Sequence, residues 1–403
     1  MPNLGHLPAE IQSLIVAHVP EQQDLSTCTL INKRFYTTTA PVFWRTLKID
    51  DDATAHKLID CVVEAYQPVG QYIRRLQLRN FEWTDTMLLR LMPHVDLLEQ
   101  FDLWDASRIT DTGFLPLVQH GHNLTSLRLR SCTSTSALIQ ALPQHCHQLR
   151  RFDISTRRHD LPADTIAILL RASPLLERLI FGMTCFSQWT DNTVLDLTRF
   201  SHLTHLEIAT RYHPMMTSQQ NQQPFFSLIN NNNSSSNIWP DLIHLVIDGF
   251  SDMTDANVIA FMKSHRQLKH LHLCGGSLSD RSLEAMAGVL LPGRLKHVGV
   301  DVIVADADAA PPSALSPGGV CRLVQTCPSL TSLTLFSRQQ HLPNAFPASG
   351  HHSRQDYMRD HFGYPSFVHL YDQEAMDKIR NNNAPHVATN DNNNGRSSLS
   401  TIS

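Results

Sequence analysis

The sequence contains one short motif that recurs along most of its length. The pattern is Leu-x-x-Leu-x-Leu, in which Ile, Phe or Val can replace a Leu, and its ten copies begin at Ile73, Leu98, Leu124, Leu149, Leu176, Leu203, Leu242, Leu268, Leu295 and Leu330. Seven of the nine intervals between successive starts are 25, 26 or 27 residues, and the other two are 39 and 35. A fixed period of this length indicates a stack of repeats, because no single unit can bury its own apolar face.

Each unit contains the same elements in the same order. A short alternating strand comes first, then a turn, then an apolar helical segment, and the turn often ends in one of these pairs: Thr84-Asp85, Thr110-Asp111, Thr190-Asp191, Thr254-Asp255 or Ser279-Asp280. Hydroxyl and carboxylate groups at this point are typical helix caps. The pattern resembles the leucine-rich repeat family over residues 47–336. The resemblance implies an α/β solenoid of about ten repeats, with a parallel sheet on the concave side and helices on the convex side.

The irregular segments are predicted from composition. Insertions are expected at 211–238, which is rich in Gln, Asn and Ser, and at 301–319, which is rich in Ala, Pro and Asp. Residues 337–403 lose the repeat and end in an Asn-rich stretch, so we expect a largely disordered tail. Within it, residues 362–379 carry enough apolar side chains to cap the last repeat.

Residues 1–46 precede the repeats and have helical periodicity. Leu7, Ile11, Leu14 and Ile15 recur at helical spacing, and Pro20 separates this helix from a second one. A third helix leads to Trp44, and three helices this short make a very small core. The segment resembles an F-box in the order and spacing of these features: Leu7-Pro8, Glu10-Ile11, Leu14-Ile15, Leu25, Leu30-Ile31, Lys33, Phe35, Ala40-Pro41 and Trp44-Arg45.

The F-box resemblance implies a partner and a function. The partner is a Skp-type adaptor, and through it a cullin/RING ligase, with adaptor contacts at Leu7, Pro8, Ile11, Leu14, Ile15, Leu25, Leu30, Lys33 and Pro41. The implied function is that of a non-catalytic substrate-recognition subunit of an SCF-type E3 ubiquitin ligase, whose repeats hold an unknown protein substrate. The alternative is a leucine-rich-repeat scaffold for protein interactions that is not linked to ubiquitin, in which the first helices only cap the solenoid.

The side chains between the buried strand positions are predicted to line the concave face. The candidate substrate-binding residues there are Arg75, Trp104, Arg128, Arg130, Arg151, Arg178, His205, His244, His270 and His297. The arginines suit an acidic or phosphorylated peptide, and Trp104 is a candidate anchor. A column of histidines could also bind a transition metal, or the surface could simply be a solvated polar face. Histidine would make a contact pH-sensitive near pH 6.5.

Composition and motifs exclude several classes of function. The net charge of −4 and the pI near 6.6 argue against nucleic acid as a partner. No apolar run reaches the roughly 20 residues of a membrane span, and we expect no membrane association. The eight cysteines contain no C-x-x-C pair, which favours a reducing cytoplasmic or nuclear compartment over a disulfide or zinc protein. Because catalytic and nucleotide-binding fingerprints are missing, we expect no enzyme activity, cofactor or metal.

Overall fold

The computed structural model describes residues 7–64, 68–79, 83–133, 135–156, 161, 164–182, 190–208, 225–232, 238–248, 250, 252–274, 278–289, 294–302, 315–337, 351–352 and 367–381. The strands within these ranges form one 13-stranded sheet in the order β1 to β11, then β13 and β12. Neighbouring strands from β1 to β11 are parallel, whereas β13 pairs antiparallel with β11 and β12 pairs antiparallel with β13.

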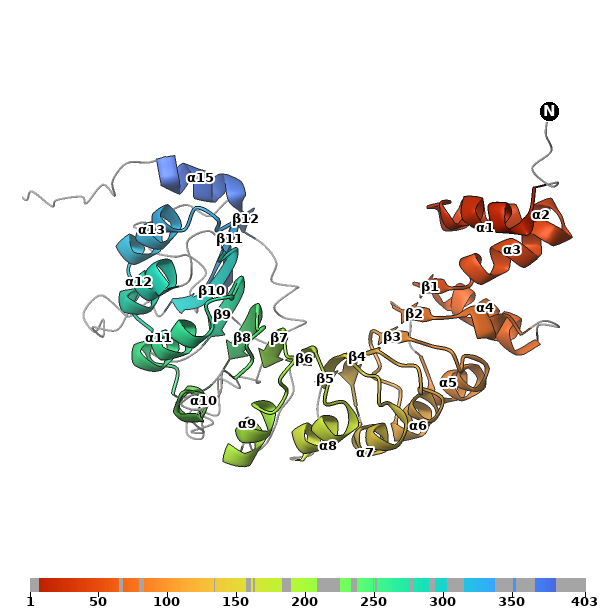
Figure 1. The fold of residues 1–403 in the computed structure, drawn as a ribbon, viewed down its shortest axis with the longest axis horizontal. Helices are drawn as coiled ribbons and strands as arrows, with labels where there is room; N and C mark the ends of the chain where they lie inside the picture. The colour runs from red at the N-terminus through yellow and green to blue at the C-terminus, as the bar shows by residue number, and fades with distance from the viewer. Residues whose placement is uncertain are drawn as a thin grey trace, which may run out of the picture.

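Each of the ten predicted motifs supplies one strand, and β1 precedes them. The strands are β1 (Thr46–Ile49), β2 (Arg75–Leu78), β3 (Gln100–Leu103), β4 (Ser126–Cys132), β5 (Arg151–Thr156), β6 (Arg178–Gly182), β7 (His205–Ile208), β8 (His244–Asp248), β9 (His270–Cys274), β10 (His297–Val302), β11 (Ser332–Ser337), β12 (His351–His352) and β13 (Phe367–Tyr371). The sheet curves into an arc with its strands on the inner side and its helices on the outer side (Figure 1). The predicted α/β solenoid is confirmed.

The helices of the solenoid alternate with these strands. They are α4 (Asp52–Glu64), α5 (Asp85–Leu91), α6 (Asp111–Gln119), α7 (Ser136–His145), α8 (Thr165–Ala172), α9 (Asp191–Leu197), α10 (Phe226–Asn232), α11 (Asp255–Ser264), α12 (Asp280–Val289), α13 (Pro317–Thr326) and α15 (Gln373–Asn381), with 3-10 turns at η2 (Val69–Tyr72) and η3 (Met92–His94). The motif's apolar positions are buried between the two layers; Leu127 and Leu129, for example, are fully buried. One continuous apolar core therefore runs the length of the arc.

The strand register matches the column that the motif predicts for the concave face. Aligned across neighbouring strands are Arg75, Gln100, Ser126, Arg151, Arg178, His205, His244, His270, His297 and Ser332. Because adjacent strands lie about 4.8 Å apart, residues that follow each other in this column are close neighbours in space.

Three helices at the N-terminus form a separate small unit, which we call the helical module. They are α1 (Ala9–Ala17), α2 (Gln22–Ile31) and α3 (Lys33–Phe43), and their own core contains Val16, Leu25 and Phe35. Asn32 caps α3 by accepting a hydrogen bond from the Phe35 backbone N–H at 2.9 Å. The module lies at one end of the arc (Figure 1).

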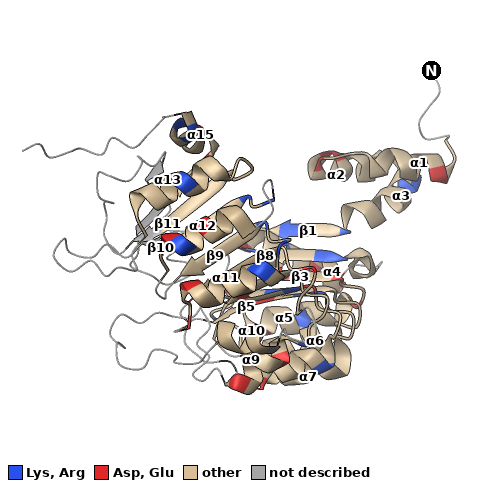
Figure 2. Ribbon diagram, turned by 60° about the vertical axis from the view of Figure 1, so that its left-hand side comes forward, with Lys and Arg blue, Asp and Glu red and all other residues tan. Residues whose placement is uncertain are grey.

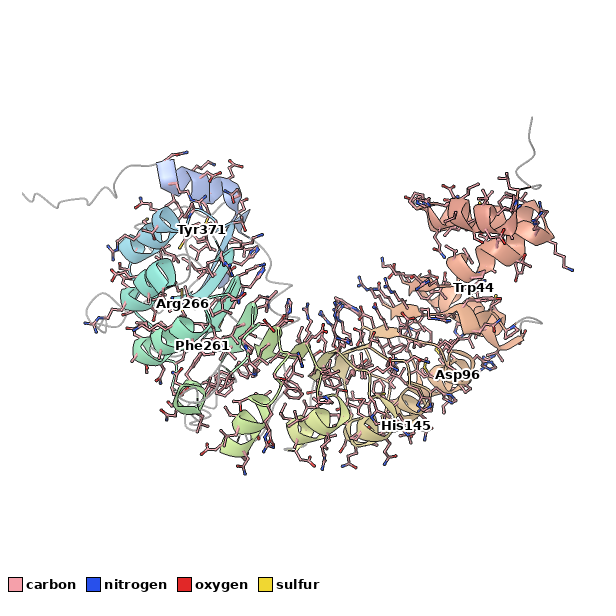
Figure 3. The ribbon with its side chains drawn as sticks, viewed as in Figure 1. Trp44, Asp96, His145, Phe261, Arg266 and Tyr371 are labelled. Carbon is pink, nitrogen blue, oxygen red and sulfur yellow. The ribbon has the colours of Figure 1, made fainter. Side chains whose placement is uncertain are left out.

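The module is joined to the solenoid without a linker. β1 begins two residues after Trp44, and the Trp44 side chain packs against the solenoid core and lies between the module and the first strands (Figure 3). The Arg45 carbonyl also accepts backbone hydrogen bonds from Arg74 and Arg75, each at 3.0 Å. These contacts fix how the module sits on the sheet.

Two of the predicted irregular segments contain regular structure. The expected insertion at 211–238 includes α10, because Phe225, Phe226 and Ile229 are buried in the solenoid core. The expected insertion at 301–319 overlaps β10 at its start and α13 at its end. Residues 209–224, 233–237 and 303–314 lie outside the described residues.

The predicted C-terminal tail contains regular structure around the capping segment. β13 and α15 fall on the predicted capping segment 362–379, and Tyr371, Met376 and Ile379 are buried against the last repeat. Arg380 donates hydrogen bonds to the carbonyls of Val324 at 3.3 Å, Cys327 at 3.1 Å and Leu330 at 2.7 Å. The remainder of the predicted tail, 338–350, 353–366 and 382–403, lies outside the described residues. Among the described helices, none combines the length and apolar character that a bilayer crossing requires.

Candidate protein-interaction surfaces

The helical module exposes aliphatic side chains on its outer helices. On α1 the exposed fractions are 42% for Ile11, 58% for Leu14 and 41% for Ile15, and these positions share one helix face. At the end of α2, Leu30 is 82% exposed and Ile31 is 55% exposed. Five of the eight large exposed apolar side chains in the described residues therefore lie within these two short helices. Such a concentration is typical of a surface that a partner covers.

The nine residues predicted to contact the adaptor differ in solvent exposure. Pro8, Ile11, Leu14, Ile15, Leu30 and Lys33 are exposed, and Leu7 and Pro41 are half-buried. Leu25 is only 6% exposed, because it packs against Val16 and Phe35 inside the module. Leu25 is therefore buried in the module as it stands, and its adaptor contact stays a prediction. Ile31, which was not among the predicted contacts, is one of the exposed side chains.

Most of the predicted arginines on the concave face are engaged by acidic neighbours. The Arg128 guanidinium lies 3.0 Å from Asp102 and 2.9 Å from Asp153, and Arg130 lies 3.4 Å from Asp153. Burial raises the pKa of the Asp153 carboxyl, whereas Arg130 and Arg128 act in the opposite direction. Figure 2 shows basic and acidic segments interleaved on these first strands. Arg128 and Arg130 thus form ion pairs within the sheet, and their role in binding a substrate stays a prediction.

Trp104 does not stand free in the concave site. The guanidinium of Arg79 lies 4.7 Å from its ring centroid and that of Arg130 lies 4.3 Å away, so the indole is a cation–π partner of two arginines. The side chain is half-buried. Its predicted role as an exposed anchor is not supported by this arrangement, because a ligand would have to displace a guanidinium to reach the ring.

Arg75 and Arg151 differ from the other arginines of the concave face. Both are exposed, and neither side chain has an ion-pair partner among the described residues. Arg178 is next to Arg151 in the register and lies 3.4 Å from Glu207. Glu207 is itself shared, because His244 Nε2 lies 3.1 Å from the same carboxylate oxygen.

The four predicted histidines form a continuous stack across β7 to β10. Their ring centroids are 5.4 Å apart between His205 and His244, 5.1 Å between His244 and His270, and 4.3 Å between His270 and His297. No three His, Cys, Asp or Glu side chains of the described residues meet in an arrangement that could hold a metal ion. The stack is therefore an aromatic, hydrogen-bonding surface.

The environment of the stack disfavours protonation. Burial, with Arg178 and His244 nearby, lowers the pKa of His205 to about 4. Burial and His297 lower the pKa of His270 to about 4, and burial lowers the pKa of His272, which is two residues further along β9, to about 4. The prediction of pH sensitivity near 6.5 is therefore wrong for these three residues, which are neutral at pH 7.

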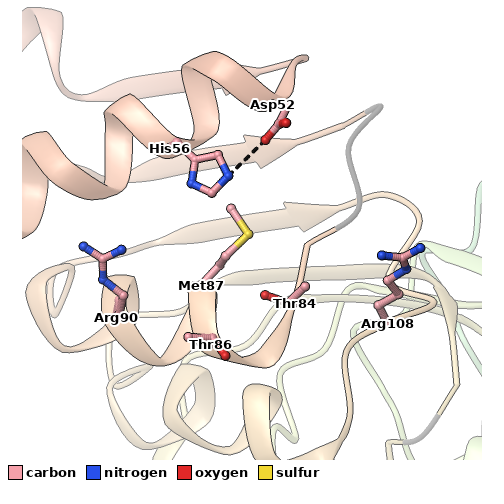
Figure 4. Close-up of a pocket in the computed structure, with 7 residues that line it drawn as sticks. All are labelled: Asp52, His56, Thr84, Thr86, Met87, Arg90 and Arg108. Atoms are coloured by element: carbon pink, nitrogen blue, oxygen red, sulfur yellow. Dashed lines mark ion pairs between the residues drawn. The ribbon is translucent and has the colours of Figure 1, made fainter.

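One open depression lies on the outer side of the first repeats. It measures about 410 Å³ and is lined by Asp52, His56, Thr84, Thr86, Met87, Arg90 and Arg108 (Figure 4). Two of the polar groups that line it pair with each other, because His56 Nε2 lies 3.1 Å from Asp52 Oδ1. A third lining residue, Arg90, pairs with Asp60 at 3.3 Å. The polar side chains that line the depression do not point toward one common reactive side chain (Figure 4).

The comparisons with known proteins support the fold. No family model matches the sequence, and no curated protein matches it. Among solved structures, the crystal structure of the Rad7 and Elc1 complex in yeast is similar, with a TM-score of 0.52 and 14% sequence identity over 81% of this chain and 81% of that chain. Together with the strand and helix order, this likeness shows a leucine-rich-repeat type of solenoid.

Proposed function

We propose that this chain is a non-catalytic substrate-recognition subunit of an SCF-type ubiquitin ligase. In this proposal the helical module binds a Skp-type adaptor and the concave sheet receives a protein target. The observation that carries the proposal is the exposed aliphatic surface of Ile11, Leu14, Ile15, Leu30 and Ile31, on a segment whose sequence resembles an F-box. A module with so small a core gains little by exposing these side chains unless a partner buries them.

The likeness to a repeat protein solved in complex with a second protein is consistent with this proposal. The competing candidate is a scaffold without a ubiquitin link, and the packing of Trp44 on the solenoid core favours it, because the module could serve only as a cap. The two candidates differ in whether the outer faces of α1 and α2 are needed for a partner.

The exposed leucines allow a direct test. We expect the double variant Leu14→Ala, Leu30→Ala to reduce recovery of a purified Skp-type adaptor at least tenfold, because each truncation removes about 1.5–3 kcal/mol of apolar burial in an interface. The readout is adaptor bound per mole of chain in a pull-down, with circular dichroism to verify the fold. The control is Leu89→Ala, Leu175→Ala, which truncates two exposed leucines outside the module, with exposed fractions of 42% and 50%. Equal recovery by wild type and the double variant would refute the adaptor role and leave the scaffold.

A second readout concerns the target. In cells, the Leu14→Ala, Leu30→Ala variant should hold protein targets that the wild-type chain passes on for degradation. Quantitative mass spectrometry of captured partners should therefore show targets enriched on the variant and the adaptor depleted from it. If the adaptor is lost and no partner accumulates, the repeats do not deliver a substrate.

A further inference from the structure

A column of side chains lies at the rim of the arc, one position before each of the parallel strands. Backbone hydrogen bonds between successive members place them side by side; the column contains Arg45, Arg74, Glu99, Thr125, Arg150, Glu177, Thr204, Ile243, Lys269, Lys296 and Thr331. In its first half, basic and acidic members are neighbours. Arg74 Nε lies 3.7 Å from Glu99 Oε1, and Arg150 Nη1 lies 2.5 Å from Glu177 Oε1. Ion pairs between adjacent repeats thus offset these charges.

Lys269 and Lys296 break this pattern. They follow each other in the column, because the Lys296 backbone N–H donates to the Lys269 carbonyl at 2.8 Å, and their other neighbours are the uncharged Ile243 and Thr331. Like charges side by side on neighbouring strands are destabilising. Their field reaches the inner surface, since burial, together with Lys296, lowers the pKa of His297. The fold therefore holds two ammonium groups together with no acid in the column to offset them.

Three further basic residues lie in the same two repeats. Lys263 is in the last turn of α11, Arg266 is in the turn before β9, and Arg294 is in the turn before β10. We call the whole set the basic rim: Lys263, Arg266, Lys269, Arg294 and Lys296. All five are exposed, and no ion-pair partner of theirs is found in the part of the chain that the structure describes, although Arg266 Nε donates to the Lys263 carbonyl at 3.3 Å. Figure 2 shows α11 acidic at its start and basic at its end.

The basic rim is opposite in sign to the chain as a whole. The corresponding turn before β8 contributes one acid, the exposed Asp241, so five positive charges and one negative charge leave an excess of four. The chain has a net charge of −4. A concentrated charge of this kind steers a partner of opposite charge to the surface that carries it.

We propose that the basic rim binds an acidic, unphosphorylated segment of a partner protein, one that presents several Asp or Glu side chains. A carboxylate placed between Lys269 and Lys296 replaces their repulsion by two attractive contacts. Three of the five residues are lysines, whose ammonium groups bind single carboxylates without the planar, bidentate geometry that arginine favours. The basic rim is a surface separate from the helical module and from the inner column, so this inference goes beyond the proposed function and does not depend on it.

The surroundings favour an acidic protein over nucleic acid or a lipid surface. The basic rim spans only two neighbouring strands, which is too short for a track of phosphate contacts, and it contains no aromatic side chain on which a base could stack. A peripheral membrane surface usually adds apolar side chains that insert between lipids. The large exposed apolar side chains of the described ranges all lie at or before Leu175, outside these repeats.

The probe is a short fluorescein-labelled peptide of alternating glutamate and serine, compared with the same peptide carrying glutamine for glutamate. Fluorescence anisotropy with the full-length chain measures Kd. We expect the glutamate peptide to bind at least tenfold more tightly than the glutamine peptide, and binding to weaken as salt is added. Lys269→Glu, Lys296→Glu should weaken it about tenfold, because two attractions become repulsions. The milder Lys269→Gln, Lys296→Gln should weaken it about threefold, and circular dichroism verifies both folds.

The matched control is Lys57→Glu, Arg171→Glu, which reverses two exposed charges on α4 and α8 and changes the net charge equally. We expect less than a twofold change. Equal binding of the two peptides, or equal losses in the two charge-reversal variants, would overturn the proposal. Tighter binding of a duplex DNA oligonucleotide than of the glutamate peptide, or cosedimentation with phosphatidylserine vesicles, would also overturn it if Lys269→Glu, Lys296→Glu abolished that binding. Adaptor recovery is measured on the same variants, and failure at the basic rim with recovery intact would leave the proposed function standing.

Discussion

At the scale of single residues, ion pairs between neighbouring strands decide which charged side chains of the concave face are available to a ligand. A pattern that places an arginine on the inner surface does not say whether an acid lies beside it, because that depends on the register between strands about 26 positions apart in sequence. The register leaves Arg151 available and occupies Arg128. It also brings His272 over Gly299, where a Cβ would lie 2.8 Å from the imidazole ring.

The close contact between Gly299 and His272 leads to a prediction about stability. We expect Gly299→Ala to lower the free energy of unfolding by about 1–3 kcal/mol, because the added methyl group forces the His272 ring or the strand to shift. Urea denaturation would measure the change. Gly288→Ala is the control: nothing lies within 4 Å of its Cβ position in α12, and alanine should stabilise a helix by about 0.5–1 kcal/mol. A Gly299→Ala variant as stable as the wild-type chain would show that the ring moves aside at no cost.

At the scale of elements, the Thr-Asp and Ser-Asp pairs both cap helices and connect repeats. The predicted capping is confirmed at Thr110, Thr190 and Thr254, whose hydroxyls accept backbone N–H groups of their own helices. Four of the five aspartates, however, also accept hydrogen bonds from the next repeat: Asp85, Asp111, Asp255 and Asp280. Asp85 accepts from the Thr110 backbone N–H at 2.8 Å and from its hydroxyl at 2.6 Å.

Asp255 allows this connection to be tested. It accepts from the Ser279 backbone N–H at 2.8 Å and from the Ser282 hydroxyl at 2.6 Å. Burial opposes ionisation, but these hydrogen bonds outweigh it and hold the pKa of Asp255 below its ordinary value, so the carboxylate is charged at pH 7. We expect Asp255→Ala to cost about 1–3 kcal/mol in chemical denaturation at pH 7.

The control for this variant is Asp191→Ala. Asp191 holds the same first position in α9, but among the described residues it has no bond of this kind to another repeat. Its replacement should cost under about 1 kcal/mol, the size of a helix-dipole effect. Equal losses at 191 and 255 would mean that the carboxylates act only on their own helices.

The sequence predicts most of the secondary-structure elements, but it does not predict which side chains of the candidate sites contact one another. Period and alternation alone predict the strands, their order and the inner column from Arg75 to Ser332, because they depend on burial, which a repeat imposes at every unit. The partners of Trp104 and the placement of Leu25 depend on side-chain contacts between separate elements, which the repeat pattern does not specify. Within the Asn-rich insertion, Phe225, Phe226 and Ile229 are the apolar side chains that mark α10 in the sequence, and the structure buries all three.

At the scale of the whole molecule, stability is expected to be a sum of neighbour contacts. Each repeat packs on the one before and the one after, and the two ends have different closing elements: the helical module at β1, and β13 with α15 at β11. Repeat arrays of this kind transmit a perturbation mainly to the adjacent unit.

Arg380 tests how far such a perturbation travels. Arg380→Ala removes three hydrogen bonds to the carbonyls of the last repeat, at Val324, Cys327 and Leu330. We expect faster amide hydrogen exchange in α13 and β11 and unchanged exchange in β2 to β4. Lys378→Ala on the same helix should leave both regions unchanged, because the Lys378 side chain pairs with the exposed Glu374 of its own helix. Faster exchange along the entire sheet would show that the arc unfolds as one unit.

The direct junction between α3 and β1 has a mechanical consequence. The Arg45 carbonyl is hydrogen-bonded to the neighbouring strand, and the half-buried Trp44 packs against the solenoid core, so no flexible linker separates the module from the sheet. The distance between the module and a point on the inner surface is then set by the number of strands between them, at about 4.8 Å per strand. Inserting or deleting one whole repeat would move everything beyond it by one strand spacing while leaving each binding surface intact.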